Sequence, residues 1–186
     1  GSASQTEDRR AASAIAHEHT NRGAHVDGVL AFAEVGSTFR AAPWTRGAGL
    51  RLSIALGEPA LALDADASTT LATYRTDLGS VRVNTWSLAL RPALRWQRGP
   101  WLGTAGVGAR AGLAQIEGSP SSPDVARGSS LVGTWGGPLV HANAGVAFTH
   151  FASRLGGELG YSLRGVSGSV DGRDRAGVQG AWVMVS

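Results

Sequence analysis

The sequence contains no cysteine, no lysine and no long run of apolar residues among its 186 positions. Without cysteine the chain forms no disulfide and offers no thiol nucleophile or cysteine-ligated metal site. A helix that crosses a bilayer needs about 18 or more consecutive apolar residues, so a helical membrane protein is excluded. All 17 basic residues are arginine, but the net charge is only +3 and the arginines are scattered, so the sequence does not indicate nucleic-acid binding.

The segment from Trp86 to Trp96 alternates between two kinds of side chain. Its even positions hold Trp86, Leu88, Leu90, Pro92, Leu94 and Trp96, and its odd positions hold Ser87, Ala89, Arg91, Ala93 and Arg95. A period of two predicts an extended strand, because successive side chains point to opposite faces. A membrane-spanning strand needs roughly 9–11 tilted residues, and indoles prefer the two membrane–water interfaces. The segment therefore predicts a strand with lipid on one side and arginine on the other.

Seven further segments alternate in a similar way, so we expect eight strands. The other seven are expected over residues 26–39, 48–56, 60–74, 101–116, 140–148, 154–164 and 176–185. In the last of them the apolar, lipid-facing set is expected to be Ala176, Val178, Trp182 and Met184. The predicted fold class is all-β: an eight-stranded antiparallel up-and-down transmembrane β-barrel over residues 26–186, preceded by a polar, flexible segment over residues 1–25 that includes a tag scar.

The expected connections differ in length on the two ends of the barrel. The segments 57–59, 97–100 and 151–153 are short, whereas 40–46, 76–80, 117–136 and 166–174 include one long and one medium loop. Outer-membrane barrels have short periplasmic turns and longer extracellular loops. This places Trp96, Trp101 and Trp182 at the periplasmic end and Trp86 at the other, so the four tryptophans are expected to form interface girdles.

The stretch from Val26 to Ser186 resembles the small eight-stranded outer-membrane barrels of the OmpA, OmpX and OmpW kind, by pattern and not by a diagnostic motif. Val178, Trp182 and Met184 keep the alternation of the final strand, while Ser186 departs from the terminal phenylalanine usual in that group. The resemblance implies a bacterial outer-membrane protein in contact with lipid. We interpret it as a monomer without enzymatic activity or cofactor, which acts as a structural, adhesion or envelope-complex component.

Once the lipid face is assigned, the opposite face of each strand gives the lumen. A charge network is expected there, made of Arg51, Asp64, Asp66, Arg91, Arg95, Arg110, Arg154, Glu158 and Arg164, with Glu34 beside it. Eight strands leave room for little more than packed side chains, so these charges should pair with one another. Because arginines outnumber acids in this set, an alternative is a narrow anion-preferring pore or small-ligand carrier.

Two more alternatives follow from single features. His141-Ala142-Asn143 resembles the His-x-Ser-Asn motif of the eight-stranded lipid A deacylases, with Glu158 as the orienting acid, but the serine nucleophile is missing. A soluble lipocalin-like barrel would instead bury its apolar face, including Trp86, Trp96 and Trp182.

Two polar stretches could contact other molecules. His17-Glu18-His19 with His25 is interpreted as a set of solvated residues and not as a metal site. The loop 117–136 is rich in Gly, Ser and Pro, and it is the expected place for an envelope or extracellular protein partner.

Overall fold

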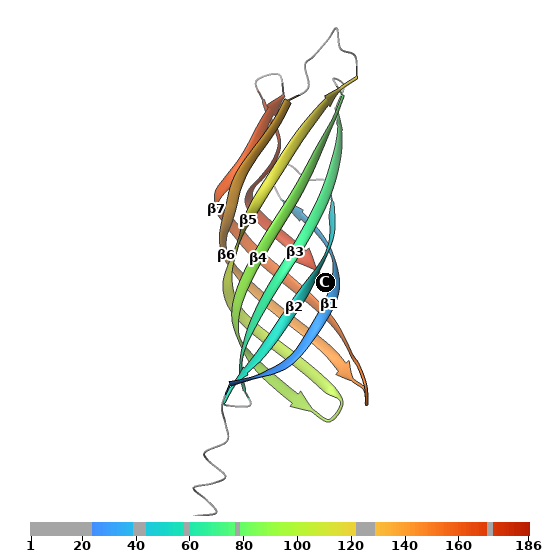
Figure 1. Cartoon of the computed structure of the whole chain (residues 1–186), viewed down its shortest axis with the longest axis vertical. Helices are drawn as coiled ribbons and strands as arrows, with labels where there is room; N and C mark the ends of the chain where they lie inside the picture. The colour runs from blue at the N-terminus through green and yellow to red at the C-terminus, as the bar shows by residue number, and fades with distance from the viewer. Residues whose placement is uncertain (1–23, 39–43, 58–59, 77–78, 122–128, 171–172) are drawn as a thin grey trace, which may run out of the picture.

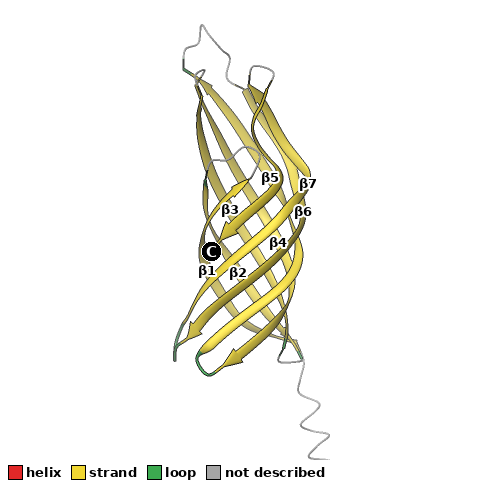
Figure 2. Ribbon diagram, turned by 180° about the vertical axis from the view of Figure 1, so that it is seen from behind, coloured by secondary structure: helices red, strands yellow, loops and turns green. Residues whose placement is uncertain are grey.

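The computed structural model describes residues 24–38, 44–57, 60–76, 79–121, 129–170 and 173–186. Its strands are β1 Ala24–Thr38, β2 Thr45–Leu56, β3 Leu61–Thr76, β4 Gly79–Arg98, β5 Trp101–Pro120, β6 Ser129–Ala147, β7 Ala152–Val170 and β8 Arg173–Val185. Each strand pairs antiparallel with the next, and β8 pairs with β1, which closes the barrel (Figures 1 and 2). The described residues include no helix long and apolar enough to cross a membrane. The predicted all-β fold, an eight-stranded antiparallel up-and-down barrel, is confirmed.

The alternating side chains form an apolar outer wall and a polar interior. Leu88 and Leu155 are 67% and 70% exposed on the outside, whereas Arg91 and Arg110 are 1% and 2% exposed inside. A soluble barrel would reverse this arrangement, because water would solvate the arginines and exclude the leucines. Apolar residues outside and charges inside are the arrangement of a transmembrane β-barrel.

The two ends of the barrel differ in shape. At one end, here called the short-turn end, Gly99 and Pro100 connect β4 to β5, and Gly99 has a φ of 58°, a left-handed conformation that favours glycine. At the other, the extended end, β3 to β7 continue beyond the hairpin of β1 and β2 (Figure 1). The two ends thus differ in the length of their strands and not, as predicted, in the length of their loops. Most of the predicted loop 166–174 is strand, because β7 continues to Val170 and β8 begins at Arg173.

The predicted loop 117–136 is mostly strand. β5 continues to Pro120 and β6 begins at Ser129, and the two strands pair as far as Gly118 and Ser129. Residues 122–128 lie outside the described residues, as do residues 1–23 of the predicted N-terminal segment with His17, Glu18 and His19. Glycine and serine suggested a loop, but Ile116 and Trp135 point inward here and pack in the core, which supports the extra length of strand.

The facing predicted for the last strand is reversed. Val178, Trp182 and Met184 point into the barrel, and Trp182 is only 1% exposed, so it does not belong to an interface girdle. The outward positions of β8 include Val183 and Val185. Because both faces of this strand carry apolar residues, hydropathy could not decide which one meets lipid.

The lumen contains two zones. Toward the extended end, buried apolar side chains pack together, namely Ala72, Val81, Val83, Ala89, Ala114, Ile116, Trp135, Leu139, Val166, Val178, Trp182 and Met184. The rings of Trp135 and Trp182 meet edge to face, with centroids 5.6 Å apart. The charged side chains form the second zone, which adjoins Trp182. Strands β3 to β7 supply nine residues of the apolar zone, and the inward facing of β8 adds Val178, Trp182 and Met184.

Candidate functional site

Strand register assembles the charged zone of the lumen. Arg51 on β2 lies opposite Asp66 on β3, and Asp64 on β3 lies opposite Arg91 on β4. Glu158 reaches the same zone from β7, on the far side of the barrel from β3. Alternation alone turns these side chains inward, but only the register of the ladders decides which of them meet.

Asp66 is the first of two carboxylates at the centre of the charged zone. Arg51 binds it at two points, with Nε 2.9 Å from Oδ1 and Nη2 3.2 Å from Oδ2. Arg91 contacts Oδ2 as well, and Arg110 Nη2 lies 3.9 Å from the same oxygen. The ring of Phe32 on β1 lies against the Arg51 guanidinium, with its centroid 5.3 Å from Cζ. One buried carboxylate thus meets three guanidinium groups.

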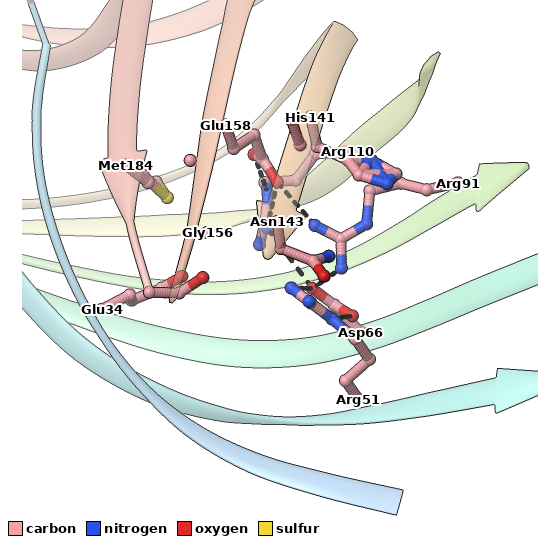
Figure 3. A pocket seen from close by; sticks show the side chains of 13 residues that line it. Glu34, Arg51, Asp66, Arg91, Arg110, His141, Asn143, Gly156, Glu158 and Met184 are labelled. Atoms are coloured by element: carbon pink, nitrogen blue, oxygen red, sulfur yellow. Dashed lines mark hydrogen bonds and ion pairs between the residues drawn. The ribbon is translucent and has the colours of Figure 1, made fainter. Parts of the chain in front are cut away.

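Glu158 is the second central carboxylate, and its two oxygens accept four hydrogen bonds. Arg110 donates through Nε to Oε1 and through Nη2 to Oε2, both at 2.8 Å. Arg91 Nη1 donates to Oε2 at 3.0 Å, and the Trp182 indole donates to Oε1 at 3.0 Å. Bidentate pairs of this kind are the strongest side-chain contacts available to arginine (Figure 3).

Hydroxyl groups complete the charged zone. Arg110 Nη1 donates to the Ser68 and Ser87 hydroxyls, each at 2.9 Å. The Ser53 hydroxyl donates to Asp64 Oδ1 at 2.6 Å. These small residues were not among the predicted site residues, and Trp182, which donates to Glu158, was predicted for the interface girdle and not for the lumen. The serines could have been found only from the register, because serine on the lumen face of a barrel is common and gives no signal by itself.

The other predicted arginines lie apart from this centre. Arg95 is partly exposed and pairs with Asp27 of β1, with Nη2 2.8 Å from Oδ2. Arg154 is partly exposed and has no ion pair within the described part of the chain. Arg164 is exposed, unlike the lumen position predicted for it. The register between β7 and β8 shifts between Ser162 and Val166, and this irregularity breaks the alternation on which the prediction was based.

Little free space remains in the charged zone. The cavity among its side chains has a volume of about 10 Å³, which is room for at most one water molecule. Among the described residues buried there are three arginines, Arg51, Arg91 and Arg110, and four carboxylates, Glu34, Asp64, Asp66 and Glu158. The excess of arginine assumed for an anion-preferring pore therefore does not hold at this level of the lumen.

His141 lies inside the barrel, as predicted, and is buried opposite Glu158. Within the described residues neither of its ring nitrogens has a hydrogen-bond partner, so no hydroxyl is held beside it. The carboxylate of Glu158 is already bound by two arginines and an indole. A nucleophile and base pair is thus not assembled around this histidine in the described residues.

Three of the four predicted girdle tryptophans, Trp86, Trp96 and Trp101, are exposed on the outer wall. Trp96 and Trp101 lie near the short-turn end, where Phe148 and Phe151 also stack with centroids 4.5 Å apart. No three or more histidine, aspartate or glutamate side chains of the described residues are grouped so that they could hold a metal ion.

Among known proteins, similarity to this chain is found in solved structures and not in sequences. No protein-family model matches the sequence, and no curated protein sequence matches it. Among solved structures, the chain is similar to Ail, the attachment invasion locus protein of Yersinia pestis, with 13% sequence identity and a TM-score of 0.49 over 88% of this chain and 95% of that one. At this identity the role of a residue in one chain does not transfer to the other.

Proposed function

We propose that the protein is a non-enzymatic barrel of the bacterial outer membrane that acts through its extended end, as an adhesion, structural or envelope-complex component. The main support for this proposal is that paired charged side chains fill the lumen, while strands β3 to β7 extend beyond the β1–β2 hairpin at one end. A barrel whose interior is closed by paired charges offers no path for solutes, so its contacts with other molecules must be made by its outer surfaces.

The hairpin of β5 and β6 is the part of the extended end best suited to such contacts. Beyond Trp86, which marks the expected membrane boundary, these strands continue for several paired residues. Leu131 and Val132 are consecutive on β6 and both are exposed. Side chains on both faces of the hairpin are therefore open to a partner, and apolar side chains exposed to water favour protein contacts.

Shortening this hairpin tests the proposal. A variant that joins Ile116 directly to Leu131 through an Asn-Gly turn keeps the register of the two strands. Expressed with a secretion signal in a strain that lacks the native gene, it should reach the outer membrane and shift on a heat-modifiability gel as the parent does. We expect it to fail to restore the surface or envelope phenotype of the deletion strain. Full restoration by the shortened barrel would contradict a role for this end.

Conductance separates this proposal from a pore. In planar bilayers the parent protein should give no current steps in concentrated potassium chloride. Replacement of both Arg110 and Glu158 by alanine removes the two-point contact that fills the lumen and should create steps. Anion-selective steps from the parent itself would favour the pore.

A further inference from the structure

The outer wall is hollowed across strands β2 to β5, which lie next to one another in Figure 1. The hollow, here called the wall groove, has a volume of about 490 Å³. Small outward side chains leave this space, and larger ones stand around it. Each strand supplies two outward residues from two consecutive rows of the sheet, namely Ala48 and Leu50, Ala67 and Thr69, Trp86 and Leu88, and Ala111 and Leu113.

The position of the wall groove makes a lipid chain its natural occupant. The outer wall faces hydrocarbon, and every outward side chain of the groove except Thr69 is apolar. An empty hollow leaves its lining atoms without dispersion contacts on one side. Trp86, the expected membrane boundary, belongs to the row of the groove nearer the extended end. A lipid whose headgroup lies beyond Trp86 can therefore place its acyl chain in the wall groove.

Three arginines lie on the same outer face, between the wall groove and the extended end, and are here called the arginine patch. They are Arg46 on β2, Arg75 on β3 and Arg82 on β4, and all three are exposed. Arg46 lies one outward step beyond the groove, and Arg82 lies four residues beyond Trp86, about 13 Å along the strand. Because Arg75 pairs with Ser80, it is the diagonal neighbour of Arg82, at a distance of about 7–8 Å.

The arginine patch is poorly neutralised by its surroundings. Within the described residues none of its three side chains forms an ion pair. Of the outward positions described beyond Trp86 on β2 to β5, the acidic one is Glu117, which lies opposite Arg82 and accepts a hydrogen bond from Gln115. Three guanidinium groups against one carboxylate leave an excess of two positive charges. Such an excess favours an anion with more than one negative charge.

We propose that the wall groove and the arginine patch together bind one membrane lipid, with an acyl chain in the groove and a headgroup of at least two negative charges on the arginines. The Trp86 indole lies between them, at the level where chain and headgroup join. Arginine suits the headgroup because its guanidinium binds phosphate at two points and its stem can lie along the apolar wall. The charge requirement distinguishes this lipid from the chains that cover any barrel wall. The inference rests on the proposed membrane location of the protein.

Quenching of Trp86 by brominated lipids tests this proposal. The full chain with Trp86 as its single tryptophan, and phenylalanine at the other five positions, is reconstituted in phosphatidylcholine vesicles that contain a small fraction of brominated lipid. Brominated cardiolipin, which carries two phosphates, should quench Trp86 at about fivefold lower bromine content than brominated phosphatidylcholine. The matched protein that keeps only Trp96, near the short-turn end, should show no such preference.

Two pairs of variants separate the headgroup from the chain. Replacing both Arg75 and Arg82 by glutamine should abolish the preference for cardiolipin, whereas the same replacement at the exposed Arg98 and Arg164 should leave it unchanged. Ala67→Leu fills the wall groove and should reduce the preference. Ala109→Leu is its control, because Ala109 is exposed on the outer wall of β5 outside the groove.

Three results would overturn the proposal. Equal quenching of Trp86 by both brominated lipids would show that the headgroup is not selected. Loss of the preference on addition of inorganic phosphate at constant ionic strength would show that the arginines bind a soluble anion. A preference that survives Ala67→Leu unchanged would show that the groove holds no chain of this lipid. A complete lack of quenching by brominated phosphatidylcholine would instead contradict the membrane location, so the two failures are distinguishable.

Discussion

Arg110 holds Glu158 at two points across the lumen, with Nε–Oε1 and Nη2–Oε2 distances of 2.8 Å each. The two residues come from β5 and β7, which are separated in the barrel by β6. Their contact therefore braces the wall from the inside. The same arginine also binds Ser68 and Ser87, so that β3, β4, β5 and β7 meet at one guanidinium.

This bracing predicts that Glu158→Gln is strongly destabilising. The neutral amide would leave Arg91 and Arg110 without their shared counter-charge inside the wall. Breaking a buried pair by removing one partner costs about 3–5 kcal/mol. The free energy of unfolding, measured by urea titration in lipid vesicles, should fall by that amount. Arg164→Gln is the matched control, because Arg164 is exposed, and it should change stability by less than about 0.5 kcal/mol. A loss for Glu158→Gln as small as that for Arg164→Gln would show that the network contributes nothing to stability.

Leu90→Arg tests the facing of the wall. Leu90 is exposed on the outer surface of β4, between Ala65 and Ala109 on the neighbouring strands. A guanidinium there would lie in hydrocarbon and should cost about 2–4 kcal/mol. Leu131→Arg on the extension of β6 introduces the same charge at an exposed leucine expected to face water, and it should be tolerated. If the Leu90→Arg protein inserts into vesicles as readily as the Leu131→Arg protein, the outer wall does not face lipid.

Tryptophan fluorescence can distinguish the two faces directly. Trp96 is exposed on the outer wall, whereas Trp182 is buried in the lumen beside Glu158. In variants that keep only one tryptophan, with phenylalanine at the other five positions, brominated lipids should quench Trp96 strongly and Trp182 hardly at all. Strong quenching of Trp182 would restore it to the interface girdle and reverse the facing of β8.

Strand facing was predictable in most of the barrel because the two faces of most strands differ in polarity. In β4, leucine and tryptophan occupy one face and Arg91 and Arg95 the other, so hydropathy alone decides which face meets lipid. In β8, the inward Trp182 and Met184 are as apolar as the outward Val183 and Val185, and the same rule fails. The outward position of Arg164 results from a shift in register between β7 and β8. Such a shift cannot be recognised from the sequence of a single strand.

The membership of the charged zone was predictable only in part, for a related reason. Alternation places Asp66 and Glu158 in the lumen, but which arginine each one meets depends on strand register and on the width of the barrel. Arg91 of β4 reaches Glu158 of β7, three strands away, because a barrel of eight strands encloses a lumen narrow enough for side chains to span. Neither quantity is encoded in the pattern of one strand, so the pairings required the structure.

A last prediction concerns Gly103, which lies under the ring of Trp96 on the neighbouring strand. A Cβ built at Gly103 would overlap the six-membered ring of that indole, whereas one built at Gly28 meets no heavy atom within 4 Å. Gly103→Ala must therefore move Trp96 away from its position against the wall, and inserting a methyl group into packed surroundings costs about 1–3 kcal/mol. Gly28→Ala adds the same methyl group without a clash and should leave stability unchanged or slightly raised. Urea unfolding in vesicles and the emission maximum of Trp96 measure the two effects together. An unchanged emission maximum in Gly103→Ala would show that the ring does not rest on this glycine, and that the indole reaches its interface by a different conformation of the side chain.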